Sequence, residues 1–325
     1  MALPRCKLHW LALLPACLLA VAAPAVTVTD LYETAQPVEG SRDAAFVEAL
    51  KTVVVRVSGQ RDAAARLAAE VNNPRKYVQR FGFTADGVLE VGFDSVSVDQ
   101  MLSGAGLPIW GHERPAMLVL LGIDDANGTH WINADSPARE RDVVTRVARD
   151  RGLPLKWPAM DSQDRAGLTA DAANSSSALL GTAARYGANA ALVGRAQGGS
   201  VRWTLVSSDG VAEASGGLED GVHLAADTFA RVFAVSGSSL GSVLVEVSGI
   251  SDLNAYATTL NYLEAMTLVR GVALEQVAGD TMRFKLAVRG DATTLRRAIA
   301  LDNRLVPQSP TDSADAGRLA FRYQP

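Results

Sequence analysis

Hydrophobic and polar positions change their spacing several times along the chain, and each spacing predicts a particular kind of element. Residues 26–32 (VTVTDLY) alternate between apolar and polar, which is typical of a half-buried strand. After Ser41, apolar residues recur at helical spacing as far as Gly59, which predicts a helix with a serine cap and a glycine stop. The other elements expected in this part are a helix over 61–72, a strand over 87–94 and a short helix around 97–104.

Between residues 114 and 235 the pattern alternates between strands and helices. Ala116–Ile123 is an unbroken apolar run, which favours a buried central strand. Ser136 followed by Pro137 predicts the start of a helix, because serine caps helices and proline is preferred in their first turn. The remaining expected elements are a helix over 175–187, a hairpin of strands over 188–197 and 200–210, and a helix over 221–235.

The last part of the chain follows a small, glycine-rich stretch at 236–242 (SGSSLGS), which we interpret as a linker. Beyond it the predicted order is strand, helix, strand, strand, helix, strand. Ser251 and Asp291 are predicted to cap the two helices, and Gly279-Asp280 to join the two middle strands. This order is typical of a ferredoxin-like sandwich, with helices on one face of an antiparallel sheet.

These patterns predict a fold of α+β and α/β type that is built from three small modules. The last module is expected to be ferredoxin-like, and the middle one to be an α/β sandwich. The expected boundaries are 1–25 for a signal peptide, 26–113 for an N-terminal α/β module, 114–235 for the middle module, 236–242 for the linker and 243–325 for the C-terminal module.

The first 25 residues have the composition of a secretory signal peptide. A basic start with Arg5 and Lys7 precedes an apolar stretch, and residues 23–25 (APA) supply the small residues that a signal peptidase reads. We therefore predict cleavage after Ala25 and export to the periplasm. Both cysteines lie inside this segment, so we expect the exported chain to have no disulfide and no thiolate metal site. The alternative is a lipid anchor at Cys17, which a nearby proline and the apolar run that follows disfavour.

Composition and charge narrow the function classes. The chain is 48% hydrophobic and 20% charged, which suits a packed globular protein. Signal cleavage would remove two basic residues and no acid, leaving 29 Lys and Arg against 35 Asp and Glu and a formal charge of −6. A mildly acidic chain is a poor candidate for binding nucleic acid, which depends on basic patches. No apolar run after the signal is long enough to span a bilayer, so we expect no transmembrane segment.

Asp124 and Asp125 directly follow the apolar run and are the first candidates for chemistry. Ligands bind at the carboxyl ends of strands in open α/β sheets, and His130 and Asp135 lie close by in the sequence. An exported metal-dependent hydrolase centred on Asp124, Asp125 and His130 is therefore one hypothesis. Adjacent strand residues point to opposite faces, however, and Asp-Asp-Ala-Asn-Gly has the composition of a turn. We favour the turn.

No residue pattern predicts a bound metal or cofactor. Only His112, His130 and His223 remain after signal cleavage, and none has the paired spacing of zinc ligands. The chain contains neither a Walker loop nor a G-x-G-x-x-G segment, which argues against nucleotide binding. Residues 237–241 match G-x-S-x-G, but a helix is predicted before the serine and a strand after it, which reverses the order of the hydrolase motif.

The segment LPIWGHERP at 107–115 contains the two remaining candidates, Trp110 and Arg114. Tryptophan and arginine dominate the hot spots of protein interfaces, so these side chains are candidates for the rim of a partner-binding surface. The alternative is that Trp110 packs into the crevice between the first two modules and that Arg114 pairs with a nearby acid. We favour this packing interpretation, and keep Trp110, Arg114, Asp124 and Asp125 as candidate binding residues.

Four stretches carry a family likeness, at 31–38, 45–59, 107–124 and 239–263. They resemble an uncharacterised family of exported bacterial proteins, the domain of unknown function numbered two thousand sixty-six. That family has no established activity, so the resemblance implies no catalytic residue. The middle module also resembles the small α/β N-terminal domain of periplasmic TolB and of curli-secretion lipoproteins, and the first module resembles part of a flagellar periplasmic protein; these are likenesses of fold.

The sequence as a whole predicts a non-catalytic periplasmic protein of three modules. We expect it to bind another envelope protein, in envelope assembly or as an accessory to a larger complex. We expect no cofactor, and the metal-dependent hydrolase is the alternative function.

Overall fold

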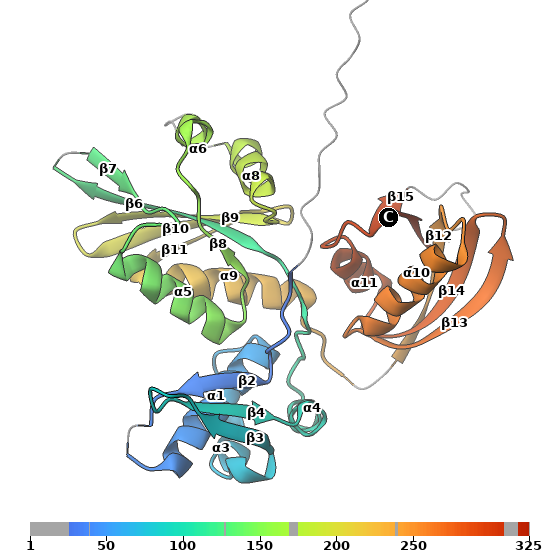
Figure 1. Ribbon diagram of the computed structural model, residues 1–325, viewed down its shortest axis with the longest axis horizontal. Coiled ribbons are helices and arrows are strands. Elements are labelled where there is room, and N and C mark those ends of the chain that lie inside the picture. Colours follow the sequence, from blue (N-terminus) through green and yellow to red (C-terminus); the bar gives the residue numbers. More distant parts are fainter. Residues whose placement is uncertain are drawn as a thin grey trace, which may run out of the picture.

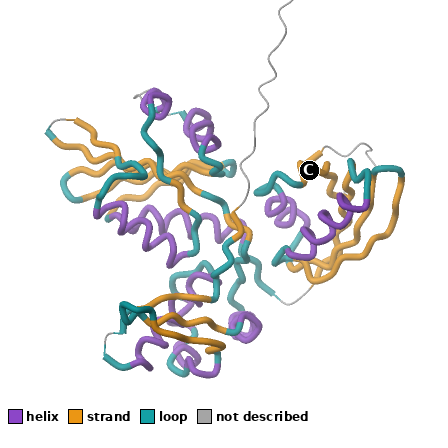
Figure 2. The backbone as a smooth tube through the Cα atoms, in the orientation of Figure 1, coloured by secondary structure: helices purple, strands orange, loops and turns teal. Residues whose placement is uncertain are grey.

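Clusters of buried apolar side chains organise the chain into three groups of elements, and the fold is mixed α+β with several separate sheets (Figures 1 and 2). The computed structural model describes residues 26–38, 40–126, 128–168, 175–237, 240–308 and 318–324. The predicted signal peptide, its cleavage after Ala25 and the alternative anchor at Cys17 lie outside these residues. Within them, no helix combines the length and the apolar character that crossing a membrane requires.

The first group is one long helix packed on a small sheet. Its elements are β1 (Val26–Thr27), β2 (Glu33–Gln36), α1 (Arg42–Ser58), α2 (Ala63–Arg66), α3 (Ala68–Val71), η1 (Pro74–Lys76), β3 (Val78–Phe83), β4 (Leu89–Phe93) and α4 (Ser95–Gly104). The antiparallel sheet has the order β2-β4-β3, and α1 packs on one of its faces. Ser41 caps α1, and Gly59 ends it in the left-handed conformation with φ 71°. These observations confirm the predicted helix after Ser41 and the elements predicted over 87–94 and 97–104.

Three details of the first group differ from the predictions. The strand expected over 26–32 is wrong beyond its first two residues, because the chain turns at Asp30, whose carbonyl accepts a hydrogen bond from the Glu33 amide. The helix expected over 61–72 is divided at Leu67 into two short helices. Strand β3 was not predicted, because its residues are mostly exposed and show no alternation of apolar and polar positions.

The second group is a sheet with helices on both faces. Its elements, with the short strand β5 that precedes them, are β5 (Glu113–Arg114), β6 (Met117–Asp125), β7 (Gly128–Trp131), α5 (Arg139–Arg151), β8 (Leu155–Lys156), α6 (Ser162–Gly167), α8 (Ser176–Arg185), β9 (Ala190–Gln197), β10 (Ser200–Ser207), β11 (Gly210–Gly216) and α9 (Leu218–Phe233). The strand order is β11-β10-β9-β6-β7, and β8 pairs with β6, while β5 pairs with β1 outside this sheet. Alternate residues of β6 point toward α5 and α9 on one face and toward α8 on the other (Figure 1).

The apolar run over 116–123 forms a buried strand as predicted, and the predicted hairpin and the helices over 175–187 and 221–235 are present. The helix predicted from Ser136 begins instead at Arg139. Ser136 does not cap it, because its hydroxyl oxygen accepts a hydrogen bond from the Asn133 amide within the preceding turn. Strands β7 and β11 were not predicted; both are hairpin partners at the edges of the sheet with many exposed residues.

The third group is a five-stranded sheet with two helices on one face (Figure 1). Its elements are β12 (Leu240–Ser248), α10 (Leu253–Ala265), β13 (Val269–Ala278), β14 (Thr281–Arg289), α11 (Ala292–Ile299), β15 (Leu305–Gln308) and β16 (Arg318–Tyr323). The order is β13-β14-β12-β16-β15; β12 and β16 are parallel, and all other neighbours are antiparallel.

The third group follows the predicted order of strands and helices except for β15, an additional edge strand. The antiparallel sheet predicted for it is wrong at one pair, because β15 comes between α11 and β16 in the chain and β16 then runs parallel to β12. The linker predicted over 236–242 is wrong at its end, because β12 already begins at Leu240; positions 238 and 239 lie outside the described residues. Asp252 caps α10 in place of the predicted Ser251, since its carboxylate accepts a hydrogen bond from the first turn of the helix. Asp291 caps α11 as predicted.

The third group contacts the segment that joins the first two. The Thr267 amide donates to Glu113 Oε1 at 2.9 Å, and the Thr267 hydroxyl accepts from the His112 amide at 3.1 Å. Helix α11 packs near α9 of the second group (Figure 1). The chain between Ile109 and Glu113 is therefore close to all three groups.

Candidate functional site

Asp124 and Asp125 lie at the tip of the β6–β7 hairpin. The register places Asp124 opposite Thr129 and Asp125 opposite Gly128. Asp124 Oδ1 accepts a hydrogen bond from Thr129 Oγ1 at 2.6 Å and lies 3.0 Å from Arg195 Nη2 in an ion pair. Asp124 is therefore engaged by neighbouring strands of its own sheet, in the way expected where a strand ends in water.

His130 does not join Asp124 in one site. It opposes Ile123, so its side chain points to the face opposite that of Asp124, while Asp125 points to the His130 face. Among the residues that the structure describes, no three His, Cys, Asp or Glu side chains are grouped so that they could hold a metal ion. We do not carry the metal-dependent hydrolase forward, because the two faces of the hairpin divide its proposed residues.

Trp110 and Arg114 are both fully buried, at 0% exposure, where the first and second groups meet. The guanidinium carbon of Arg114 lies 4.0 Å from the centroid of the Trp110 ring, which is a cation–π contact. The Trp110 amide donates to the Val57 carbonyl at 2.7 Å, in the last turn of α1. The two side chains therefore form no exposed rim; they pack between the groups, and Arg114 pairs with backbone carbonyls in place of the expected acid.

Arg114 donates every N–H of its guanidinium to a backbone carbonyl. The acceptors are the carbonyls of Arg56, Trp110, Gly111, Arg151 and Gly152, at 2.8 to 3.4 Å. Three of them belong to the C-terminal ends of α1 and α5, where carbonyls lack helical partners and carry the negative end of the helix dipole. One buried side chain thus caps two helices. Burial lowers the pKa of Arg114, and so do the positive charges of Arg56 and Arg151.

Arg151 extends this cluster toward α9. Its Nη2 donates to the Gly59 carbonyl at 2.9 Å and to Asp227 Oδ1 at 2.7 Å. Its Nη1 lies 2.9 Å from His223 Nδ1; since a guanidinium only donates, that ring nitrogen is the acceptor and carries no proton. Burial lowers the pKa of His223, and the positive charges of Arg151 and Arg61 act in the same direction.

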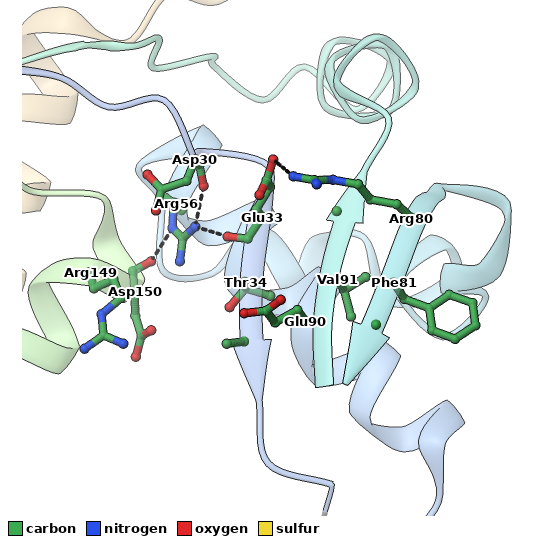
Figure 3. A pocket seen from close by; sticks show the side chains of 13 residues that line it. Asp30, Glu33, Thr34, Arg56, Arg80, Phe81, Glu90, Val91, Arg149 and Asp150 are labelled. Atoms are coloured by element: carbon green, nitrogen blue, oxygen red, sulfur yellow. Dashed lines mark hydrogen bonds and ion pairs between the residues drawn. The ribbon is translucent and has the colours of Figure 1, made fainter. Parts of the chain in front are cut away.

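Arg56 completes the cluster but leaves one amino group unused. The side chain is 3% exposed, and it donates to the carbonyls of Asp150, Asp30 and Glu33 at 3.2, 3.1 and 2.6 Å. Its Nη2 has no hydrogen-bond partner in the described part of the chain, and Figure 3 shows it pointing into the space between α5 and β2. Burial lowers the pKa of Arg56, against the opposing effect of the negative charges of Asp150 and Asp30.

That space is a groove of about 410 Å³, which we call the β2 groove (Figure 3). It runs from Arg149 and Asp150, at the end of α5, across one face of the sheet β2-β4-β3. Its lining contains three arginines and four acids, and some of these pair with one another: Glu33 forms an ion pair with Arg80. The groove therefore carries little net charge.

The β2 groove is open where this face of the sheet carries small residues between Glu33, Arg80 and Glu90. The strand register places Ala35, Gly82 and Gly92 on the face that also carries Glu33 and Arg80. A Cβ at Gly82 would meet no atom within 4 Å, whereas one at Gly92 would lie 2.8 Å from Cγ of Arg80, which crosses that strand. Glycine at 92 thus allows the Arg80 side chain to lie flat, and glycine at 82 leaves the space open.

Part of the backbone of β2 faces the groove as an open edge. The Phe93 amide donates to the Tyr32 carbonyl, which sets the alternation of bonds between β2 and β4. By that alternation the amide and carbonyl of Ala35 point away from β4, as does the Glu33 carbonyl. Arg56 Nη1 already binds the Glu33 carbonyl, so the guanidinium of Arg56 lies along the same edge as Ala35.

Neither Arg56 nor the β2 groove was predicted from the sequence. The available signal was one arginine inside an apolar helical run, TVVVRVSG at 52–59, since a charge on the buried face of a helix requires partners. Those partners are carbonyls at 30–33 and at 150, and nothing in their residue types marks them as acceptors.

Residues 25–111 match a family model described as Domain of unknown function (DUF8605). This match corrects the resemblance described above, because the family that the four stretches resemble is a different one. The matched residues include Arg56 and all three strands of the small sheet, but not Arg149 and Asp150, which form the other side of the groove. No curated protein and no solved structure matches the chain.

Proposed function

We propose that this chain is an exported periplasmic protein without catalytic activity, which binds a partner protein of the cell envelope in assembly or as an accessory subunit. The observation that carries the proposal is the β2 groove. It presents a donor at the end of a buried side chain, Arg56 Nη2, and an open strand edge, and both are groups that another polypeptide would complete. The composition of residues 1–25 supports the export step.

We also propose that the three groups of elements are modules with the boundaries 26–113, 114–235 and 243–325. The strand order β13-β14-β12-β16, with α10 and α11 on one face, supports a ferredoxin-like assignment for the last module, from which the added strand β15 and the parallel direction of β16 depart. The helices on both faces of the second sheet support a TolB-like α/β sandwich for the middle module.

The binding part of the proposal is tested by placing a photo-crosslinking amino acid at Ala35 or at Gly82 in the full chain, produced in bacterial cells. We expect irradiation to give a covalent adduct with an envelope protein at both positions. Leu253, which is 79% exposed on α10, is the control position, because it lies outside the groove and tests for adducts that exposure alone would produce. Adducts at Leu253 but not at Ala35 or Gly82 would contradict the proposal.

Export is tested separately by cell fractionation and by the mass of the mature chain. We expect the protein in the periplasmic fraction with Val26 as its first residue. Recovery in the cytoplasm with residues 1–25 retained would contradict export. A chain that begins at Cys17 and carries acyl chains would support the lipid anchor in place of cleavage after Ala25.

A further inference from the structure

We infer that the β2 groove binds an extended, uncharged segment of a partner polypeptide, which adds to the open edge of β2 as a further strand. The inference rests on the proposed function and specifies the chemistry by which the partner is recognised. It depends on three observations: the acceptors of Arg56 and Arg114, the open backbone groups of β2, and the charge balance of the groove.

The acceptors of Arg56 and Arg114 are all of one kind, whereas the third buried arginine, Arg151, also pairs with the Asp227 carboxylate. Every hydrogen bond that Arg56 and Arg114 donate ends on a backbone carbonyl. Arg56 is held by two peptide segments, at 30–33 and at 150, and its remaining amino group points into the groove (Figure 3). The Arg56 side chain is 97% buried and has little access to water, so its remaining N–H groups are stabilised by an acceptor from another molecule. A backbone carbonyl of an added strand is such an acceptor.

The open edge of β2 offers further backbone groups beside the Arg56 donor. The amide and carbonyl of Ala35 both point to the open side, and neither has a partner in the described part of the chain. Farther along this edge the Glu33 carbonyl is occupied by Arg56, so Arg56 Nη2 supplies the next free donor. An added strand would therefore meet the donor and acceptor of Ala35 and then the donor of Arg56, which is the recognition mode of strand addition.

The charges favour an uncharged segment over an anion. The acids and arginines of the lining nearly balance, and two acids are already paired, Glu33 with Arg80 and Asp150 with Arg146. A site for phosphate or for a free carboxylate would be expected to present an excess of positive charge.

The inference is tested with a fluorescent peptide of sequence Thr-Val-Thr-Val-Thr, blocked at both ends so that it carries no charge, and the full chain after signal removal. We expect saturable binding by fluorescence anisotropy. An analogue with the central amide replaced by an ester lacks one N–H, and we expect it to bind about three- to tenfold more weakly. An excess of inorganic phosphate should leave binding unchanged.

Variants connect the binding to the edge of β2. Ala35→Pro removes the amide that faces the groove but no hydrogen bond to β4, so the sheet should persist while binding falls about tenfold or more. Gly82→Val adds a side chain on β3, on the far side of β4 from the open edge, so we expect it to bind like the unchanged chain. The matched control is Ala273→Val on the exposed strand β13, which should bind like the unchanged chain.

The inference is overturned if the peptide does not bind saturably, if the ester analogue binds equally well, or if phosphate displaces the peptide. Equal binding by Ala35→Pro and by the Ala273→Val control would also overturn it. If crosslinks at Ala35 and Gly82 persist in cells while the peptide fails to bind, partner binding stands and strand addition is wrong. If both experiments fail, the proposed function fails with the inference.

Discussion

Arg114 and Arg56 lie in one buried cluster, at 0% and 3% exposure, yet they use their hydrogen bonds differently. Arg114 donates all five of its N–H groups to backbone carbonyls, whereas Arg56 keeps one amino group directed at the β2 groove. Burial and residue type are the same in both places. A buried arginine whose donors are all occupied holds the surrounding segments together, whereas the open amino group of Arg56 is available to the partner that we propose.

The difference follows from what surrounds each guanidinium. Arg114 lies where the C-terminal ends of α1 and α5 meet the backbone at 110–111, so unpaired carbonyls approach it from three directions. Arg56 has carbonyls on two sides only, from the turn that leads into β2 and from the end of α5. Its third side faces the hollow that small residues leave over the sheet.

The largest effect is expected from Arg114→Met. Methionine fills similar space but leaves five buried carbonyls without a donor and separates the ends of two helices, so we expect a loss of about 3–5 kcal/mol in the free energy of unfolding. Urea denaturation followed by circular dichroism measures it. Arg149→Gln, at an exposed arginine of the same helix α5, is the control and should change stability by less than about 0.5 kcal/mol. A loss below about 1 kcal/mol for Arg114→Met would show that the carbonyls are satisfied by water.

The next effect concerns Gly152, which separates the two arginines. It has φ +68°, and a Cβ there would lie 2.8 Å from both Arg114 Nη1 and Arg56 Cγ. We expect Gly152→Ala to lose about 2–3 kcal/mol of stability, from left-handed strain together with displacement of both side chains. Gly279→Ala has similar strain, with φ +64° and no atom within 4 Å, and should lose only about 1 kcal/mol. Equal losses for the two variants, in the same denaturation experiment, would mean that the contacts with the arginines are unimportant.

A smaller effect is expected from Arg56→Lys. The ammonium retains the charge but not the planar fork, so some of the carbonyls at 30–33 and at 150 lose their donor; we expect a loss of about 1–2 kcal/mol in unfolding free energy. The control is Arg80→Lys, at a side chain that is 66% exposed, which should change stability by less than about 0.5 kcal/mol. If Arg56→Lys were as damaging as Arg114→Met, the two ends of the cluster would be equivalent and the comparison would be wrong.

The smallest effect is a dependence on pH through His223. Because the pKa of His223 is lowered in the folded protein, the unfolded chain binds the proton more readily below the ordinary value of about 6.5. The contribution of His223 to the free energy of unfolding is therefore fully present above about pH 6.5. It decreases as the pH falls toward the lowered pKa of the folded protein. The groups that face the ring are Arg151, Arg61, Asp227 and Glu219.

His223→Gln removes this titration and keeps a side chain able to accept from Arg151. We expect the stability difference between the unchanged chain and His223→Gln to shrink, or to change sign, between about pH 7.5 and about pH 5. Thermal unfolding at several pH values measures it. A difference that stays constant over this range would show that His223 does not titrate against the arginine cluster.

The parts of the fold that could be predicted are those specified by neighbours in sequence. The helices α1 and α11 have local caps in Ser41 and Asp291, and β6 is an unbroken apolar run, so their patterns were sufficient. The edge strands β3, β7, β11 and β15 were not recognised, because many of their residues are exposed and pairing with a neighbour holds them in place. Ser136 shows the converse: a residue of the right type for a cap is used in the preceding turn.

The candidate site was predicted less well than the fold, for a related reason. Trp110 and Arg114 were singled out by residue type, and their position between the first two groups agrees with the packing interpretation. The expected acidic partner of Arg114 was wrong, because helix ends offer carbonyls that no residue type reveals. Arg56 was overlooked, although an arginine on an apolar helical face is itself a signal worth following.

From its residues alone, this chain specifies the placement of most of its main helices and the buried strand β6, because each depends on contacts within a short stretch, while the export predicted from residues 1–25 stays a prediction. Only the tertiary structure decides that all N–H groups of Arg114 have acceptors and that one amino group of Arg56 has none among the described residues. The carbonyls at 30–33, 56, 110–111 and 150–152 meet around the two guanidinium groups, and the glycines of a separate strand pair leave the hollow beside one of them. Backbone acceptors look alike in every residue, so their convergence depends on the folded geometry.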